Sequence, residues 1–341
     1  MYERDANLPE LSIVVPILDE EDGIGELSRR LAAVMDALDT TAEIVFVDDG
    51  SRDGSPELLA RLNRSDSRFK VVRLSRNFGH QVAITAGLHH ASGRAVVVMD
   101  GDLQDPPEVI PKLVERWRDG FDVVYASRER RDDEPWPLRT AKLFYYRLLK
   151  RMTDIEIPVD VGDFRLVDRR VLEVFKGMPE HNPYVRGMFS WIGFKQTSVR
   201  YRRDERHAGQ SKYPLGKLVK LALDGIIGFS DLPLRLALNV GFAISALTFL
   251  LGVAAVACKL SNIYVVPGWA SLVVVISFIG GIQLAVLGAV GLYVGRIYEE
   301  VKNRPLYVVD ELYGFVSEMP GKRAVRSGRG EAPAGRDRSI G

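Results

Sequence analysis

Residues 94–107 read RAVVVMDGDLQDPP, an apolar run that ends in closely spaced aspartates. Short runs rich in valine and isoleucine are typical of buried parallel strands. The first 130 residues contain five such runs, at Leu11–Pro16, Glu43–Val47, Lys70–Leu74, Arg94–Met99 and Phe121–Ala126. Amphipathic stretches separate them, at Gly23–Leu38, Ser55–Asn63, His80–Ala91 and Pro107–Arg118. This alternation predicts an α/β fold with a mostly parallel sheet and helices on both faces.

Acidic residues follow three of these runs. The first ends in PILDEE (16–21), the second in VDDGS (47–51) and the fourth in MDGDLQDPP (99–107). An isolated Asp-Gly pair is more often a simple turn. Ligands of open α/β sheets bind beyond the carboxyl ends of the strands, however. Three acidic ends at one edge therefore favour a binding crevice over three unrelated turns.

Asp100 and Asp102 form the most specific of these motifs. Two carboxylates two residues apart suit a hard divalent cation, and Mg²⁺ is usually held by one or two carboxylates plus substrate phosphates. Gln104 could add a ligand or a hydrogen bond. The motif predicts a Mg²⁺ or Mn²⁺ site, where the metal would neutralise charge on a leaving diphosphate.

The composition excludes several other classes. Lys and Arg number 46 against 45 for Asp and Glu, so the net charge of +1 does not indicate a nucleic-acid partner. Cys258 is the single cysteine, which excludes an intramolecular disulfide and a zinc site built on several cysteines. Charged residues near the start of the chain replace the apolar run of a signal peptide, so we expect the start to stay in the cytosol.

Two long uncharged stretches lie near the end of the chain, at Leu236–Cys258 and Ala270–Gly295. About 20 apolar residues cross a bilayer core, so both predict membrane helices rather than a pair of buried core helices. The loop between them carries only Lys259, whereas basic residues crowd both outer flanks. The positive-inside rule then places both ends of the hairpin, and so both termini, in the cytoplasm. Glycines in the second stretch allow close helix packing.

The segment before the first stretch is basic. Gly216–Ser230 is expected to form an amphipathic helix in the membrane interface. Only Asp204 and Glu205 oppose the cations of residues 200–220, which are Arg200, Arg202, Arg203, Arg206, Lys212, Lys217 and Lys220. The tail after Pro320 is almost without apolar residues, which predicts disorder.

These motifs resemble those of a known family. VVPILDEE, VDDGS and MDGDLQDPP look like family 2 glycosyltransferases with the GT-A fold. SRNFGHQVAITAGLHHASG, VGDFRLVDRR and RHAGQSKYPLGKL narrow the resemblance to polyprenyl-phosphate glycosyltransferases. Within them the chain is most similar to the bactoprenol glucosyltransferase group, which is related to dolichol-phosphate mannose synthase. The resemblance extends over about residues 10–312 and includes both apolar stretches. QDPP and GQSKY are specific, whereas VDDGS is shared across the superfamily.

The resemblance implies roles for the matching residues. It assigns the nucleotide to Pro16, Asp19, Glu20, Asp48 and Asp100, with Asp19 in place of the more usual Asn. It assigns the metal and diphosphate to Asp100, Asp102 and Gln104, and a phosphate to Arg128. Asp163 matches the position of a proposed catalytic base. The loop that closes over the phosphates would contain Arg203, Arg206, Ser211 and Lys212.

Elementary chemistry qualifies the base assignment. A phosphate monoester has its second pKa near about 6, so the acceptor is largely a dianion at neutral pH and needs little deprotonation. Asp163 could instead position the acceptor or stabilise positive charge on the anomeric carbon; a turn residue without a direct role is the alternative. Bringing two phosphate groups together requires cations. We expect Arg203, Arg206 and Lys212 to supply them, and Lys217 and Lys220 to bind the membrane.

The predicted enzyme is an inverting, metal-dependent hexosyltransferase of the bacterial inner membrane. Its donor is a nucleotide sugar, with UDP-glucose as the first candidate, and its acceptor is undecaprenyl phosphate or another polyprenyl phosphate. N-acetylglucosamine, galactose, mannose or amino-arabinose are alternative sugars. A polysaccharide synthase would need a Q-x-x-R-W motif and more spans, and a non-catalytic membrane scaffold would not need the intact acidic motifs. The related enzymes imply a possible homo-oligomer.

His80, His89 and His90 have no evident carboxylate partners, which favours packing or surface roles over a metal site.

The chain divides accordingly into four expected parts. These are a GT-A catalytic domain (1–205), a basic acceptor loop with an interfacial helix (206–234), two membrane helices at about 236–258 and 270–295 with a cytoplasmic exit segment (235–312), and a disordered tail (313–341).

Overall fold

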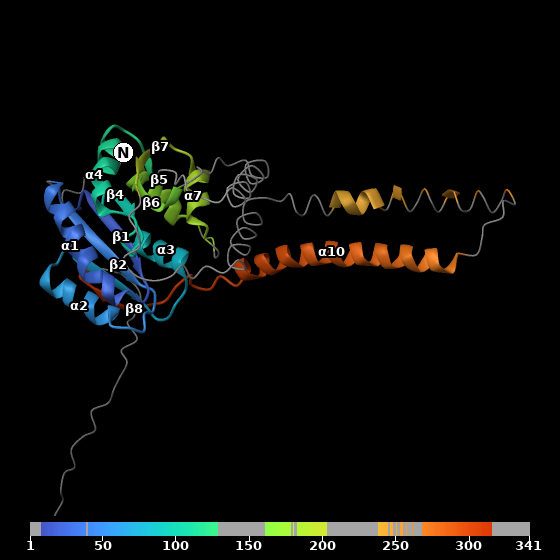
Figure 1. Cartoon of the computed structure of the whole chain (residues 1–341), viewed down its shortest axis with the longest axis horizontal. Helices are drawn as coiled ribbons and strands as arrows, with labels where there is room; N and C mark the ends of the chain where they lie inside the picture. The colour runs from blue at the N-terminus through green and yellow to red at the C-terminus, as the bar shows by residue number, and fades with distance from the viewer. Residues whose placement is uncertain are drawn as a thin grey trace, which may run out of the picture.

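The computed structural model describes residues 8–128 except 39, residues 161–202 except 179, 181 and 182, residues 268–315, and short pieces between 238 and 261. Its centre is an eight-stranded sheet with the order β7-β5-β6-β4-β1-β2-β3-β8 (Figure 1). The predicted residues Arg203, Arg206, Ser211 and Lys212 lie outside the described parts.

The middle of the sheet confirms the parallel prediction. The strands β1 (Leu11–Ile17), β2 (Ala42–Asp48), β3 (Phe69–Leu74) and β4 (Ala95–Val98) pair in parallel in the order β4-β1-β2-β3. Their apolar side chains are buried on both faces, because helices cover each side. The fifth predicted strand is β5 (Val123–Arg128).

The outer parts of the sheet correct the prediction, because the sheet is mixed. The strand β6 (Val161–Asp168) runs antiparallel to both β4 and β5. Beyond it, β7 (Gln196–Tyr201) is parallel to β5. The buried charges of Asp163 and Arg165 interrupt the apolar pattern of β6, and such charges are rare in strands unless they are paired. The strand was therefore not recognisable from periodicity.

Helices pack on both faces of the sheet, as expected. One hydrophobic core lies under α1 (Glu21–Ala37), α2 (Ser55–Ser65) and α4 (Ile110–Arg118), which follows the short helix η1 (Pro107–Val109). The second core lies under the helices α3 (His80–His90), α6 (Arg169–Lys176) and α7 (Val185–Ile192).

The helix α10 (Trp269–Val301) projects away from this α/β domain (Figure 1). It contains the candidate membrane span found among the described residues, Val274–Val301, with a mean hydropathy of 2.1 and 0% burial in its most apolar window. A length of 33 residues corresponds to about 50 Å, whereas a bilayer core is about 30 Å thick. The second predicted stretch is thus one helix that continues past residue 295. Only fragments of the first stretch are described, so the hairpin remains a prediction.

After α10 the chain returns to the sheet. The strand β8 (Val309–Tyr313) pairs antiparallel with the edge strand β3, with Arg73 opposite Glu311. This strand was not predicted. Its charged residues are suited to a sheet edge, where they discourage pairing with other chains. The segment after α10 therefore completes the sheet of the N-terminal domain.

Candidate active site

The predicted acidic strand ends meet at one edge of the sheet. Because β1, β2 and β4 are parallel, their carboxyl ends lie side by side. Since β6 is antiparallel to β4, with Val98 opposite Arg165, the beginning of β6 lies beside the end of β4. This arrangement brings Asp163 next to Asp100, although the two are far apart in the sequence.

The VDDGS motif holds the segment that leads into α3. The two carboxylate oxygens of Asp49 accept the backbone N–H groups of Phe78 and Gly79 at 2.7 and 2.9 Å. Gly50 has a φ of 74°, and a Cβ there would lie 2.5 Å from the carbonyl carbon of Arg76. Both features fix the loop whose next residue is His80.

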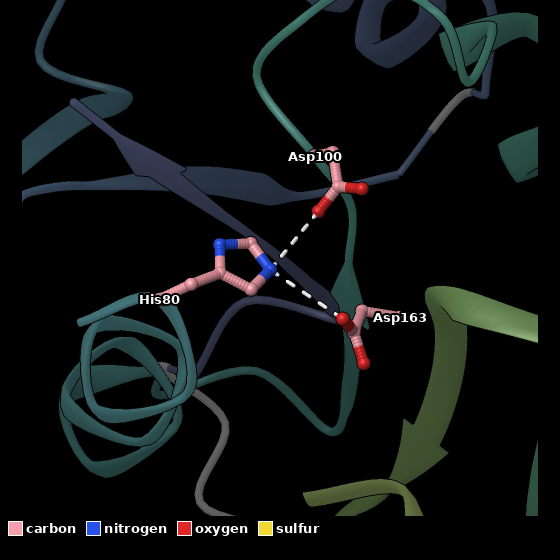
Figure 2. Close-up of side chains that lie close together, drawn as sticks. All are labelled: His80, Asp100 and Asp163. Carbon is pink, nitrogen blue, oxygen red and sulfur yellow. Dashed lines mark ion pairs between the residues drawn. The ribbon is translucent and has the colours of Figure 1, made fainter. Parts of the chain in front are cut away.

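His80 faces two aspartates (Figure 2). Its Nε2 lies 3.3 Å from Oδ1 of Asp100 and 3.4 Å from Oδ2 of Asp163. Burial disfavours the charged imidazole, but the two carboxylates outweigh this effect and raise the pKa of His80 to about 10. The prediction that His80 lacks carboxylate partners is therefore wrong. It failed because Asp163 comes from a strand that the sequence pattern concealed.

The other two histidines confirm the packing prediction. The ring of His89 lies 6.0 Å from that of Tyr307, and the ring of His90 lies 5.6 Å from that of Phe315. These aromatic residues belong to the segment after α10, so the end of α3 packs against the returning chain.

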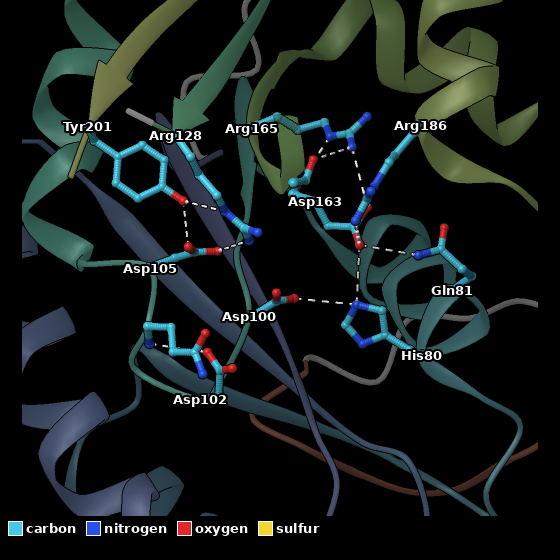
Figure 3. A network of polar contacts seen from close by, with 12 residues as sticks. His80, Gln81, Asp100, Asp102, Asp105, Arg128, Asp163, Arg165, Arg186 and Tyr201 are labelled. Carbon is cyan, nitrogen blue, oxygen red and sulfur yellow. Dashed lines mark hydrogen bonds and ion pairs between the residues drawn. The ribbon is translucent and has the colours of Figure 1, made fainter. Parts of the chain in front are cut away.

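Asp163 is buried inside a cage of donors (Figure 3). Arg186 binds it with both arms of its guanidinium, Nε to Oδ1 at 2.8 Å and Nη2 to Oδ2 at 3.0 Å. Gln81 donates to Oδ2 at 3.3 Å, and Arg165 donates to Oδ1 at 3.4 Å. Burial alone would raise the pKa of Asp163, but the charge of Arg186 and the bonds from its other donors hold it well below its usual range.

Arg165 stiffens the strand that carries Asp163. It is fully buried, and its guanidinium lies 5.4 Å from the ring centre of Tyr125 and 5.5 Å from that of Phe189. It donates to the backbone oxygens of Gly162 and Asp163. Neither Arg165 nor Arg186 was predicted as a site residue. The sequence GDFR placed Arg165 near the site, but nothing in the sequence indicated Arg186.

A second network surrounds Asp105, the last aspartate of the DGDLQDPP motif. The fully buried carboxylate of Asp105 accepts the hydroxyl of Tyr201 and lies 3.5 Å from Nη2 of Arg128. The Nε of Arg128 also donates to the Tyr201 hydroxyl at 3.3 Å. A Cβ on Gly162 would lie 2.9 Å from Arg128 Nη2, so Arg128 abuts the beginning of β6. The predicted phosphate ligand Arg128 thus lies close to Asp163.

The loop 100–105 fits a divalent cation. Oδ1 of Asp100 is buried, and its neighbour is Nε2 of His80 at 3.3 Å. The backbone N–H of Gln104 donates to Oδ1 of Asp102 at 3.1 Å, and the Gln104 side chain is buried. Leu103 has a φ of 59°, so the loop turns tightly. Carboxylate and amide oxygens of this kind suit Mg²⁺ or Mn²⁺.

His80, Asp100 and Asp163 form a second group that could hold a metal, because their ligand atoms lie within 4.8 Å of one another. Two guanidinium groups also contact Asp163 there. A divalent cation bound to Asp163 would meet their positive charges. The electrostatics therefore favour a metal on the Asp102 side of Asp100.

The predicted nucleotide residues lie at the same edge. Asp19 has a φ of 53°, a conformation that Asp and Asn tolerate better than most residues, and its Oδ1 accepts the N–H of Arg52 at 2.8 Å. The N–H of Glu20 donates to the hydroxyl of Ser55 at 3.1 Å. Both contacts join the segments after β1 and β2.

Two more of the predicted nucleotide residues lie within the strands. Pro16 is buried in β1. Asp48 is fully buried and accepts the N–H of Ser51 at 2.9 Å.

Residues 12–175 match the family model described as Glycosyl transferase family 2. The chain is 50% identical to the "Uncharacterized glycosyltransferase YkcC" of Bacillus subtilis over 304 residues, 89% of this chain and 94% of the relative. It is 41% identical to the "Bactoprenol glucosyl transferase" of Shigella phage SfII, over 88% of this chain and 97% of the relative. The solved mannosyltransferase PcManGT from Pyrobaculum calidifontis, in complex with GDP-Man and Mn²⁺, is 17% identical with a TM-score of 0.46, covering 86% of this chain and 88% of that one.

Proposed function

Because the chain belongs to glycosyl transferase family 2, we propose that it transfers a hexose from a nucleotide sugar to a polyprenyl phosphate at the cytoplasmic face of a membrane. The chain is a glycosyltransferase with a GT-A-like α/β fold, and relatives that match most of its length are named for bactoprenol. One structural observation carries the proposal. The acidic loop around Asp102, the caged Asp163 and Arg128 lie together at the carboxyl edge of the sheet.

The donor would bind through its nucleotide and its diphosphate. Pro16, Asp19, Glu20 and Asp48 would hold the nucleoside, while Asp100, Asp102 and Gln104 would hold Mg²⁺ or Mn²⁺. When bound, the metal would neutralise charge on the diphosphate. UDP-glucose is the first candidate donor, and N-acetylglucosamine, galactose, mannose or amino-arabinose donors are the alternatives. Arg128 would contact a phosphate through the guanidinium fork.

We infer an inverting single displacement. A phosphate oxygen of the acceptor attacks the anomeric carbon from the face opposite the diphosphate. The bond from that carbon to the diphosphate oxygen breaks, and its electron pair leaves with the nucleoside diphosphate. No proton has to be removed, because the acceptor is largely a dianion at neutral pH. Arg186 and the other donors occupy both oxygens of Asp163, which supports a positioning role for this residue rather than a proton-accepting one.

The membrane arrangement follows from α10 and the apolar stretch before it. We infer two spans, at about 236–258 and 270–295, with the catalytic domain and both termini in the cytoplasm of a bacterial cell. The basic loop 206–234 would lie between the catalytic domain and the first span, and the predicted tail, apart from Tyr313, which belongs to β8, would follow that strand. A lipid-borne phosphate could then reach the crevice from the bilayer surface, in one protomer or in a homo-oligomer.

Cysteine labelling tests this topology. Ser261→Cys, made after replacing the native Cys258 with serine, is expected to react with a membrane-impermeant reagent in intact cells. The reason is that the hairpin places residue 261 outside. Ser67→Cys, on the exposed surface of the catalytic domain, is the matched control and should react only after lysis. Labelling of Ser261→Cys only after lysis would refute the hairpin.

The acceptor assay tests the function itself. Purified protein is given a panel of nucleotide sugars with undecaprenyl phosphate or undecaprenol, which differ only in the phosphate. Transfer is expected with the phosphate alone. Arg206→Ala should lower turnover far more than it weakens UDP binding, and Arg206→Lys should restore it only in part, because an ammonium lacks the planar fork. Equal transfer to the alcohol would contradict a phosphate acceptor.

A further inference from the structure

Three charged residues form a row across the strands β2, β3 and β8, and the row begins at the carboxyl end of β2, where the predicted nucleotide residues lie. Asp48 is the last residue of β2 and lies opposite Arg73 on β3, which in turn lies opposite Glu311 on β8. Residues in register on neighbouring strands point to the same face. Nη1 of Arg73 lies 3.0 Å from Oε2 of Glu311, and Nε lies 3.5 Å from Oδ2 of Asp48. We call these three residues the charge ladder.

The inner end of the charge ladder is a constrained carboxylate. Asp48 is fully buried, and the N–H of Ser51 fixes its Oδ1. Its Oδ2 is buried and makes no hydrogen bond with the described residues, so the longer contact with Arg73 is its ionic neighbour. A buried carboxylate in this position favours a cation held close to it.

The outer end of the charge ladder sets the orientation of Arg73. Oε2 of Glu311 accepts both the Arg73 guanidinium and the hydroxyl of Tyr313, at 3.0 and 2.7 Å. Arg73 therefore directs Nε and Nη1 toward two acids, while 34% of its side chain stays exposed at the carboxyl edge of the sheet. A guanidinium has five N–H donors in a fixed fork, so Arg73 can meet a ligand without leaving either acid.

Stability alone is a weak explanation of the charge ladder. Both Arg73 and Glu311 are more than one-third exposed, and exposed ion pairs contribute little to the free energy of unfolding. The placement is better explained by a ligand, because the row ends at the edge where the predicted nucleotide residues lie.

We propose that Arg73 is a further donor-binding residue, which donates to a carbonyl oxygen of the nucleobase, and that Glu311 is the residue that positions it. This inference rests on the proposed function, which assigns the nucleotide to Asp48. It makes the strand that follows the membrane helix a part of the donor site. Donor binding then depends on the pairing of β8 with β3.

Nucleotide binding by the full-length protein tests the inference. UDP is titrated in the presence of Mg²⁺, and the dissociation constant is compared with donor KM and kcat. Arg73→Gln is expected to weaken UDP binding about tenfold, as the loss of a hydrogen bond from a charged group does. Glu311→Gln should weaken it about threefold, with little change in kcat, because the cation remains but is no longer held. Arg73→Lys should be intermediate, since the charge is kept and the fork is lost.

Two controls separate positioning from structure. Glu173→Gln breaks a half-buried pair with Arg169, which follows the far end of β6, and should leave UDP affinity unchanged. The exchange variant, Arg73→Glu with Glu311→Arg, keeps the ion pair but moves the cation away from Asp48. Its thermal midpoint should fall, because a carboxylate then lies opposite the buried Asp48, and the folded fraction should still bind UDP weakly.

Three outcomes are decisive. Wild-type affinity in Arg73→Gln and Arg73→Lys, or restored affinity in the exchange variant, would overturn the inference alone. A wild-type protein that binds neither UDP nor GDP would overturn the proposed nucleotide donor, and the inference with it. The UDP titration does not require activity with undecaprenyl phosphate, so failure of the acceptor assignment leaves that part of the test intact.

Discussion

Asp102→Asn is expected to lose nearly all transfer activity, roughly 100-fold or more, while the protein remains folded and bound to membranes. An amide is a poorer ligand than a carboxylate for a hard divalent cation, so the diphosphate would lose the charge that offsets its own. The fold should survive, because Asp102 lies in a loop and its contact with the Gln104 N–H needs only an oxygen acceptor, which Asn retains.

The measurement has two parts. Transfer is assayed at saturating Mg²⁺, and Mn²⁺ binding to the purified protein is followed by electron paramagnetic resonance, which does not depend on turnover. Asp66→Asn is the matched control, because Asp66 pairs with Arg68 before β3, at the opposite edge of the sheet. If Asp102→Asn kept more than a tenth of the wild-type activity, the metal assignment would be wrong.

The parts of the fold that the sequence predicted are those with an unbroken pattern. The strands β1 to β4 are mostly apolar and largely buried, and the helices α1 and α2 each bury one apolar face against them. Local chemistry was enough here because each element buries its own apolar residues. The acidic strand ends were predictable for a related reason, since parallel strands place their carboxyl ends together.

The strands β6 and β8 could not be predicted in this way. Arg165 and Asp163 give β6 a charged centre, and only the folded structure shows that these charges are paired with one another and with Arg186. In β8 the charges of Asp310 and Glu311 mark an edge strand. Its partner β3 lies more than 230 positions earlier, a separation that local periodicity does not detect.

The site shows the same division. Asp100, Asp102 and Gln104 stand in one motif, so their proximity was evident from the sequence. His80, Gln81 and Arg186 reach Asp163 from two different helices. A signal for His80 did exist: VDDGS and the loop before α3 lie at adjacent strand ends, and Asp49 joins them. Only the antiparallel placement of β6, however, supplies the carboxylate of Asp163.

The cage around Asp163 leads to the second large expected effect. Asp163→Asn and Arg186→Gln should each lower kcat roughly 100-fold, and the double variant should lose no more than either single one, because groups that act as a unit are not additive. Arg186→Gln should also destabilise the protein by about 3–5 kcal/mol, since it leaves a buried carboxylate without its main partner. Unfolding is measured by thermal scans, and kcat is measured on the fraction that remains folded.

The pH dependence of kcat distinguishes a positioning Asp163 from a base. The depressed pKa keeps Asp163 ionised through the neutral range, so as a base it would limit the rate only when the pH falls below its ordinary value. We expect the rate to fall near about pH 6 instead, where the acceptor phosphate gains a proton. Arg186→Gln removes a cation that opposes the effect of burial, so the pKa of Asp163 should rise. The acid limb should nevertheless stay where the acceptor sets it. A limb that moves to higher pH in Arg186→Gln, together with additive losses in the double variant, would show that Asp163 accepts a proton during transfer.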